Sequence, residues 1–183
     1  MPLLKGALHV HTTLSDGQLT PQQAAAQYAR LGFDFVALTD HDYLLRPNHA
    51  QSLQVKTNGL LVLPGVEITL HERGYVHVNR ITGSHEVLHI FNHPAEYDLE
   101  FHDLLRVLEA VAQKYPIDAV EVSSKGFYTP EYDNPRIPYP KVASDDSHTA
   151  GGCGRAWIEV ESERDADAII RAIKNGAARP CFR

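Results

Sequence analysis

Two pairs of residues with the spacing of metal ligands lie in different parts of the 183-residue chain. His9 and His11 are two residues apart in "ALHVH", and Asp146 and His148 repeat that spacing in "SDDSH". Alternate residues of an extended strand share a face and lie about 6.6 Å apart, so two imidazoles can tilt onto one ion at about 2.0 to 2.1 Å. Packed into a core, the same rings would occupy places that apolar side chains usually fill. We therefore interpret both pairs as candidate ligands.

Further imidazoles and carboxylates follow other apolar runs of the sequence. They are Asp16 in "SDG", His41 in "LTDHD", Glu67 in "PGVEIT", His77 in "YVHVN" and His93 in "FNHP". A single histidine is more often satisfied in a core or exposed to solvent than bound to a metal, but so many in one pattern favour ligation. Mixed nitrogen and oxygen donors suit zinc, manganese or iron, whereas calcium prefers oxygen alone.

The elements that position these residues alternate between strands and helices. We predict strands over residues 7–11, 33–40, 59–70, 75–82, 87–94, 118–124, 141–146 and 155–161, and helices over 21–32, 101–116 and 165–176. Helices between buried strands imply crossover connections, an α/β fold and a largely parallel sheet of about seven strands. The carboxyl ends of parallel strands converge on one face, so we expect the candidate ligands to meet there.

Composition limits the class of protein. Hydrophobic residues make up 43% and charged residues 22%, which is typical of a globular chain, and we expect one domain over residues 1–183. The net charge of −6, with no basic stripe, argues against extended nucleic-acid contact. The sequence shows neither a signal peptide nor a membrane span, so we expect a cytoplasmic protein that does not bind membranes. The pattern does not indicate an oligomeric state.

Six motifs, in order, resemble the signature of the PHP superfamily, the polymerase and histidinol phosphatase domains. They are "HVHTTLSDG", "ALTDHD", "LPGVEIT", "HVN", "NHP" and "SDDSH". The resemblance extends from residue 5 to about residue 160. It implies a distorted (β/α)7 TIM-like barrel and a cluster of two or three divalent ions, whether zinc, manganese or iron.

The resemblance also implies which residues hold each ion. His9, His11, Glu67 and Asp146 would hold the first ion; Glu67 would bridge to a second, bound by His77 and His93; Asp16, His41 and His148 would hold the third. Three divalent ions with three carboxylate ligands leave a net charge of about +3, which favours a small anionic substrate. A metal-bound water whose pKa is lowered toward about 7 can attack a phosphate ester. The expected activity is thus hydrolysis of a small phosphorylated molecule or a short nucleotide.

Three further residues are candidates for roles in catalysis or substrate binding. Asp145 is placed to orient the water or to protonate the leaving oxygen, and equally to accept a hydrogen bond from a ligand imidazole. Arg155 and Lys125 are candidate phosphate-binding residues, although pairing with surface acids accounts for such residues about as well.

Two other functions remain open on the sequence alone. The same activated water can attack the carbonyl carbon of a carbamate, an amide or a carboxyl ester, and some members of the superfamily use this chemistry. The second alternative is a non-catalytic, metal-stabilised regulatory module, because the superfamily also occurs attached to polymerases.

Overall fold

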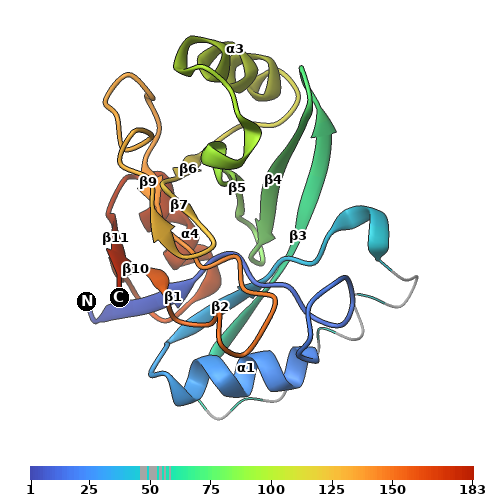
Figure 1. Ribbon diagram of the computed structural model, residues 1–183. Helices are drawn as coiled ribbons and strands as arrows, with labels where there is room; N and C mark the ends of the chain where they lie inside the picture. Colours follow the sequence, from blue (N-terminus) through green and yellow to red (C-terminus); the bar gives the residue numbers. More distant parts are fainter. Residues whose placement is uncertain (46–48, 50–52, 54, 56, 58) are drawn as a thin grey trace.

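The computed structural model describes residues 1–45, 49, 53, 55, 57 and 59–183. A nine-stranded sheet dominates these residues and curves into a nearly closed barrel (Figure 1). The order of its strands is β11-β10-β1-β2-β3-β4-β5-β6-β9, and β7 and β8 form a separate two-stranded ribbon. The predicted α/β class and the barrel-like architecture are confirmed.

The elements have the following bounds. The strands are β1 (Leu3–Ala7), β2 (Phe35–Leu38), β3 (Leu61–His71), β4 (Tyr75–Thr82), β5 (Val87–Phe91), β6 (Ala119–Glu121), β7 (Ser123–Ser124), β8 (Phe127–Tyr128), β9 (Lys141–Val142), β10 (Ala156–Glu161) and β11 (Ala178–Phe182). The helices are α1 (Pro21–Arg30), α3 (Phe101–Ala112) and α4 (Ala166–Lys174), with 3₁₀ turns η1 (Asp42–Leu44) and η2 (Pro94–Tyr97). Among the described residues, no helix combines the length and the apolar character needed to cross a membrane.

The expectation of a largely parallel sheet is wrong. The pairs β1–β2, β2–β3, β5–β6 and β6–β9 are parallel, but β1–β10, β10–β11, β3–β4 and β4–β5 are antiparallel. The links from β3 to β4 and from β4 to β5 are short turns, and a parallel crossover needs a dozen or more residues. β11 was not predicted, because Pro180 and Arg179 interrupt the alternation typical of strands; it lies at the edge of the sheet, where proline is tolerated.

The first helix shows how local sequence sets an element boundary. The Thr20 side chain accepts a hydrogen bond from the Gln23 backbone N–H, and the Gln23 side chain accepts one from the Thr20 N–H. Pro21 then occupies the first turn, where its missing N–H costs nothing. The helix therefore starts at a fixed residue, directly after the segment that carries His11 and Asp16.

Helices cover both faces of the sheet. α1 packs with the cluster that contains Val36, whereas α4 packs with the cluster that contains Phe35. Successive residues of a strand point to opposite faces, so these two helices lie on opposite sides of β2. α3 packs on β4, β5 and β6 through a third apolar cluster. Hydrophobic burial on both faces thus holds the strands that contain or precede the candidate ligands.

One face of β3 and β4 changes from apolar to polar along its length. Leu63 and Ile81 belong to the same buried apolar cluster. Residues in register across the two strands then include Glu67 opposite Asn79 and Thr69 opposite His77. Because alternate residues share a face, Glu67 continues the face of Leu63. The barrel interior is accordingly a packed core at one end and a polar site at the other.

A glycine at one strand pairing is required by close approach rather than by backbone conformation. Gly6 lies opposite Phe35, and a Cβ atom added to Gly6 would come within 1.9 Å of the Phe35 ring. Gly6→Ala is therefore expected to destabilise the fold by about 1–3 kcal/mol, the usual cost of overpacking. Urea unfolding measures this loss. Gly151→Ala is the matched control, because a Cβ there meets nothing within 4 Å; equal stability of both variants would contradict the prediction.

Candidate metal centre

The barrel closes where the segment after β1 meets the segment after β9. Val10 and Ser147 form a parallel bridge, and the His11 N–H donates to the Ser147 carbonyl at 3.0 Å. The Leu8 N–H donates to the Ser144 hydroxyl at 3.1 Å. β1 ends at Ala7, so the two histidines follow the strand instead of lying in it as predicted. This pairing brings the His-x-His segment beside the Asp-x-His segment.

Glu67 lies at the centre of the site and is 1% exposed. Its Oε1 lies 3.2 Å from His9 Nε2, 3.1 Å from His77 Nδ1 and 3.2 Å from His93 Nε2; its Oε2 lies 3.3 Å from His11 Nε2 and 2.9 Å from His41 Nδ1. One carboxylate thus faces five imidazoles from four different parts of the chain.

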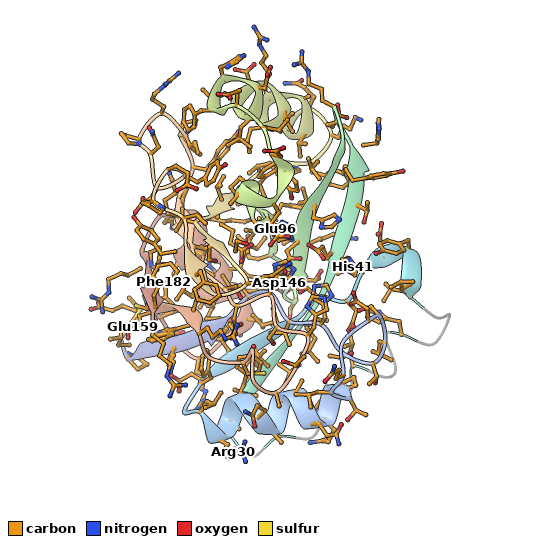
Figure 2. All side chains as sticks on the ribbon, viewed as in Figure 1. Arg30, His41, Glu96, Asp146, Glu159 and Phe182 are labelled. Atoms are coloured by element: carbon orange, nitrogen blue, oxygen red, sulfur yellow. The ribbon has the colours of Figure 1, made fainter. Side chains whose placement is uncertain are left out.

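Two aspartates complete the set of donors. Asp146 Oδ1 lies 3.4 Å from His9 Nε2 and 3.2 Å from His11 Nε2, and 3.6 Å from His148 Nδ1. Asp16 is more exposed and lies at the rim. Its Oδ1 is 3.4 Å from His11 Nδ1, and its Oδ2 is 3.6 Å from His41 Nε2 and 3.3 Å from His148 Nε2. Figure 2 shows His41 and Asp146 near the middle of the molecule.

The structure brings all nine predicted ligands into one cluster. Their donor atoms form four overlapping groups: His11, Asp16, His41 and His148; His9, His11 and Glu67; His9, His93 and Asp146; and His41, Glu67 and His77. Within each group, every donor atom lies within 4.8 Å of the others. The overlap indicates a multinuclear site, because several residues belong to two groups.

The spacing of the donors fits metal coordination. Atoms at the corners of a tetrahedron with bonds of 2.0–2.1 Å are roughly 3.3–3.4 Å apart. The Nε2 atoms of His9 and His11 lie 3.1 Å apart, and both lie within 3.4 Å of Asp146 Oδ1. That oxygen is buried and has no hydrogen-bond partner among the described residues, nor has His77 Nδ1. A cation would satisfy buried donor atoms that have this spacing and lack hydrogen-bond partners.

The charges in the cluster shift one another's pKa. Burial disfavours the charged imidazolium of His11, but its contacts with Asp146, Asp16 and Glu67 outweigh burial and raise its pKa to about 10. The pKa of His9 rises in the same way, against burial, through Glu67 and Asp146. Burial would raise the pKa of Glu67, but the surrounding imidazoles lower it. In the absence of metal, the cluster therefore holds protons that a cation would displace.

Residues behind the ligands fix their orientation. The Asn92 side-chain amide donates to Glu67 Oε1 at 2.8 Å. Glu121 Oε2 accepts from the His93 N–H at 2.9 Å and lies 3.5 Å from His9 Nδ1. Sequence reasoning missed both residues. The available signal was a glutamate in the apolar run "DAVEV" and an asparagine directly before a ligand histidine.

Asp40 orders the loop that presents Asp16. Its carboxylate accepts from the Thr12 N–H at 2.8 Å, the Thr12 hydroxyl at 2.9 Å and the Ser15 hydroxyl at 2.6 Å. Asp40 is fully buried, so these three donors satisfy its charge. Its carbonyl also accepts from the Glu67 N–H at 3.1 Å, which links two ligand segments.

Glu121→Gln is expected to weaken metal affinity about 10- to 100-fold with little loss of folding. The amide keeps the size of the side chain but removes the charge that orients His9. Competition with a chromophoric chelator measures the affinity. Glu109→Gln, on the exposed side of α3, is the control and should bind metal like the unsubstituted chain. An unchanged affinity of Glu121→Gln would contradict a role for this carboxylate in orienting His9.

Two of the candidate ligands have backbone conformations that residues other than glycine rarely adopt. His93 has φ +23° and Asp146 has φ +45°. Such conformations cost on the order of 1–3 kcal/mol each and persist where the surrounding structure determines them. At Asp146 the barrel closure supplies this constraint, and at His93 the hydrogen bond from its N–H to Glu121 does so.

Asp145 points away from the donor cluster. Its Oδ1 accepts from the Tyr28 hydroxyl at 2.9 Å, and its Oδ2 accepts from the backbone N–H groups of Gly154 and Arg155. Burial raises the pKa of this carboxyl to about 7. No described imidazole pairs with it, so its contacts fix the 153–155 segment against α1.

Lys125 and Arg155 lie on cavities beside the cluster. A cavity of about 190 Å³ is lined by six of the nine candidate ligands together with Glu96 and Lys125. A second cavity, of about 360 Å³, reaches from Asp146 and His148 to Lys125 and Arg155. Both cationic side chains are exposed. The guanidinium of Arg155 also lies 5.7 Å from the centre of the Phe127 ring, which restrains it near the second cavity.

Fold and site together define an α/β barrel-like protein with a multinuclear site of imidazoles and carboxylates. Solved structures share this fold. The chain matches a two-domain protein from Bacteroides vulgatus, described as containing a predicted PHP-like metal-dependent phosphoesterase, with a TM-score of 0.76 over 100% of this chain and 65% of that one, at 20% identity. It also matches an amidohydrolase from Chromobacterium violaceum with a TM-score of 0.66, covering 97% of each chain, at 15% identity.

The chain belongs to the PHP domain family, whose model matches residues 7–153, and a PHP-associated model matches residues 136–178. Over 74 residues it is 36% identical to the 5'-3' exoribonuclease Rnm of Salmonella typhimurium. Over 69 residues it is 38% identical to the phosphoribosyl 1,2-cyclic phosphate 1,2-diphosphodiesterase of Eggerthella lenta. These segments cover 39% and 37% of this chain but only 25% and 26% of the relatives.

Proposed function

We propose that this chain is a metal-dependent hydrolase that cleaves a phosphate ester of a small molecule or a short nucleotide. The observation that carries the proposal is the convergence of nine ligand side chains beside cavities that also expose Lys125 and Arg155. Bound metal ions and the cationic side chains of Lys125 and Arg155 would both attract an anionic substrate. The names of the two curated relatives support a phosphate-ester substrate, since one is an exoribonuclease and the other a cyclic-phosphate diphosphodiesterase.

The residues would divide among two or three ions as the family resemblance implies. His9, His11, Glu67 and Asp146 would hold the first, Glu67, His77 and His93 the second, and Asp16, His41 and His148 the third. The donor groups of the structure cross this division, since His93 also groups with His9 and Asp146, and His77 with His41. Bound divalent ions would polarise the phosphate and lower the pKa of water, which supplies a nucleophile at neutral pH.

Four residues outside the candidate ligand set would bind the substrate or position other side chains. Lys125 and Arg155 attract the substrate anion and hold its free oxygens on the side of Asp146 and His148. Asp145 acts as a positioning residue, because its hydrogen bonds to two backbone N–H groups hold Arg155 at the cavity. Asn92 holds Glu67 Oε1 in one orientation through the hydrogen bond from its side-chain amide.

The test begins with elemental analysis of protein purified without added metal. Chelated protein is then reloaded with zinc, manganese or iron and assayed against phosphate monoesters, phosphate diesters, carbamates, amides and carboxyl esters. We expect hydrolysis of a phosphate ester that chelation removes and one of these metals restores. Hydrolysis of carbonyl substrates alone, or metal binding without any turnover, would overturn the proposal in favour of the carbonyl hydrolase or the regulatory module.

A further inference from the structure

A larger cavity of about 620 Å³ adjoins the metal centre and shares no lining residue with the cavity of Arg155. It is lined by Asp42, Tyr43, Thr69, Tyr75 and His77. His77 also lines the cavity of the metal cluster, so the two spaces share a wall. A cavity of this size accommodates a small organic group. Nothing in the proposed hydrolysis uses it.

Two exposed tyrosines contribute aromatic surface to this cavity. Tyr43 is 64% exposed and Tyr75 is 72% exposed, although aromatic side chains of this size are usually much more buried. The Tyr43 ring lies 5.1 Å from the ring of His41, one of the candidate ligands. The Tyr75 ring lies 5.4 Å from His71, in an edge-to-face arrangement. The aromatic surface therefore begins directly beside the metal centre.

The backbone under both tyrosines is held in place. Asp42 Oδ1 accepts from the Tyr43 N–H at 2.9 Å and from the Thr69 N–H at 3.2 Å, which ties η1 to β3. Tyr75 begins β4 and lies in register with His71 of β3. The backbones of η1 and β4, which carry the two rings, are thus both attached to β3, so little backbone ordering would accompany binding.

The charges on the two sides of the metal centre differ. The 620 Å³ cavity has one carboxylate, that of Asp42, and its described lining includes neither lysine nor arginine. The 360 Å³ cavity has Lys125 and Arg155. A further anionic group is therefore favoured in the 360 Å³ cavity, whereas an uncharged group is favoured beside Tyr43 and Tyr75.

We propose that this cavity binds a planar, uncharged aromatic group joined to the substrate phosphate, with Tyr43 and Tyr75 as the residues that select it. The inference rests on the proposed function only in placing the phosphate at the metal centre. Aromatic rings prefer offset or edge-to-face contacts, and the two exposed tyrosine rings offer surface for such contacts.

Binding of two phosphonates tests the proposal without any turnover. Phenylphosphonate and methylphosphonate both present the anion through a carbon–phosphorus bond that the enzyme does not hydrolyse, and they differ in the ring. Calorimetry on the metal-loaded protein should show about 10-fold tighter binding of phenylphosphonate, because burial of the ring favours it. Tyr43→Ala and Tyr75→Ala should each reduce this preference about 2- to 5-fold, and the double variant should abolish it. Methylphosphonate affinity should change less than about 2-fold, since the metal centre is intact.

Tyr128→Ala is the matched control, because Tyr128 is also exposed but lies on β8 and contacts Asp133. It should keep the full preference for phenylphosphonate. Equal binding of the two phosphonates by the unsubstituted protein, or a preference that survives in the double variant, would overturn the aromatic subsite. A protein that shows the ring preference but hydrolyses no phosphate ester would overturn the proposed function and leave the subsite standing.

Discussion

Glu67→Gln is expected to lower turnover about 1,000-fold or more and to reduce the number of bound metal ions. Both carboxylate oxygens face imidazole nitrogens, and the side chain is buried. Glutamine keeps the volume but replaces one acceptor oxygen with an N–H₂ donor and removes the negative charge. A bridging ligand contributes to two ions, so several kcal/mol of stabilisation are lost, which corresponds to the stated factor. Elemental analysis and steady-state kinetics on the same preparation measure both effects.

Glu163→Gln provides the comparison, because Glu163 is exposed and lies outside the donor groups. It should retain full metal content and activity. Circular dichroism shows whether Glu67→Gln remains folded. A folded Glu67→Gln protein with normal metal content and normal turnover would remove Glu67 from the centre of the site. Any activity that remains in the Glu67→Gln preparation also sets an upper limit on contaminating hydrolases in the substrate assays.

Removal of metal is expected to reverse the pH dependence of stability around the site. In the metal-free protein, the pKa of His11 is raised from 6.5 to about 10, so its protonated form stabilises the fold below pH 6.5. That contribution is lost as the pH rises through about 10. The pKa values of Glu67 and Asp146 are lowered, so their contributions are present above about pH 4.5 and are lost only in strong acid. The metal-free protein should be most stable between about pH 4.5 and 6.5.

Metal binding should be favoured at higher pH, because cations replace the protons on these imidazoles. One ion present at 1,000 times its Kd adds about 4 kcal/mol to the free energy of unfolding. We expect this gain to be larger at pH 8 than at pH 6. Thermal unfolding of chelated and reloaded protein at both pH values, in buffers of equal ionic strength, measures it. Metal-free protein that becomes more stable between pH 6.5 and 9 would contradict the assignment of protons to this cluster.

The sequence was informative about the ligands because metal chemistry restricts residue type and spacing. The His-x-His and Asp-x-His pairs placed two donors each, and His93 follows β5 as expected. The expectation that all the candidates follow strands is wrong for Glu67 and His77, which lie within β3 and β4. The structure brings the candidates into one cluster through the closure at Val10 and Ser147. That long-range pairing was not visible in any local pattern.

What the sequence did not reveal depends on tertiary contacts. The mixed sheet follows from short turns that allow antiparallel pairing, whereas the pattern of alternating elements favoured crossovers. Asp40 and Glu121 are buried carboxylates whose partners are backbone N–H groups and hydroxyls from distant segments. The exposed tyrosines of the large cavity are ordinary residues until the fold places them beside a ligand.

Val10 and Ser147, whose pairing closes the barrel, lie 137 positions apart in the sequence. This separation bears on the order in which the chain folds during synthesis. His9 and His11 are synthesised well before Asp146 and His148, so the cluster can assemble only after residue 148 has been made. Contacts of such sequence separation form slowly. A nascent chain therefore offers cations only scattered, low-affinity imidazoles. We therefore expect metal binding to follow closure of the barrel, because the donors come together only then.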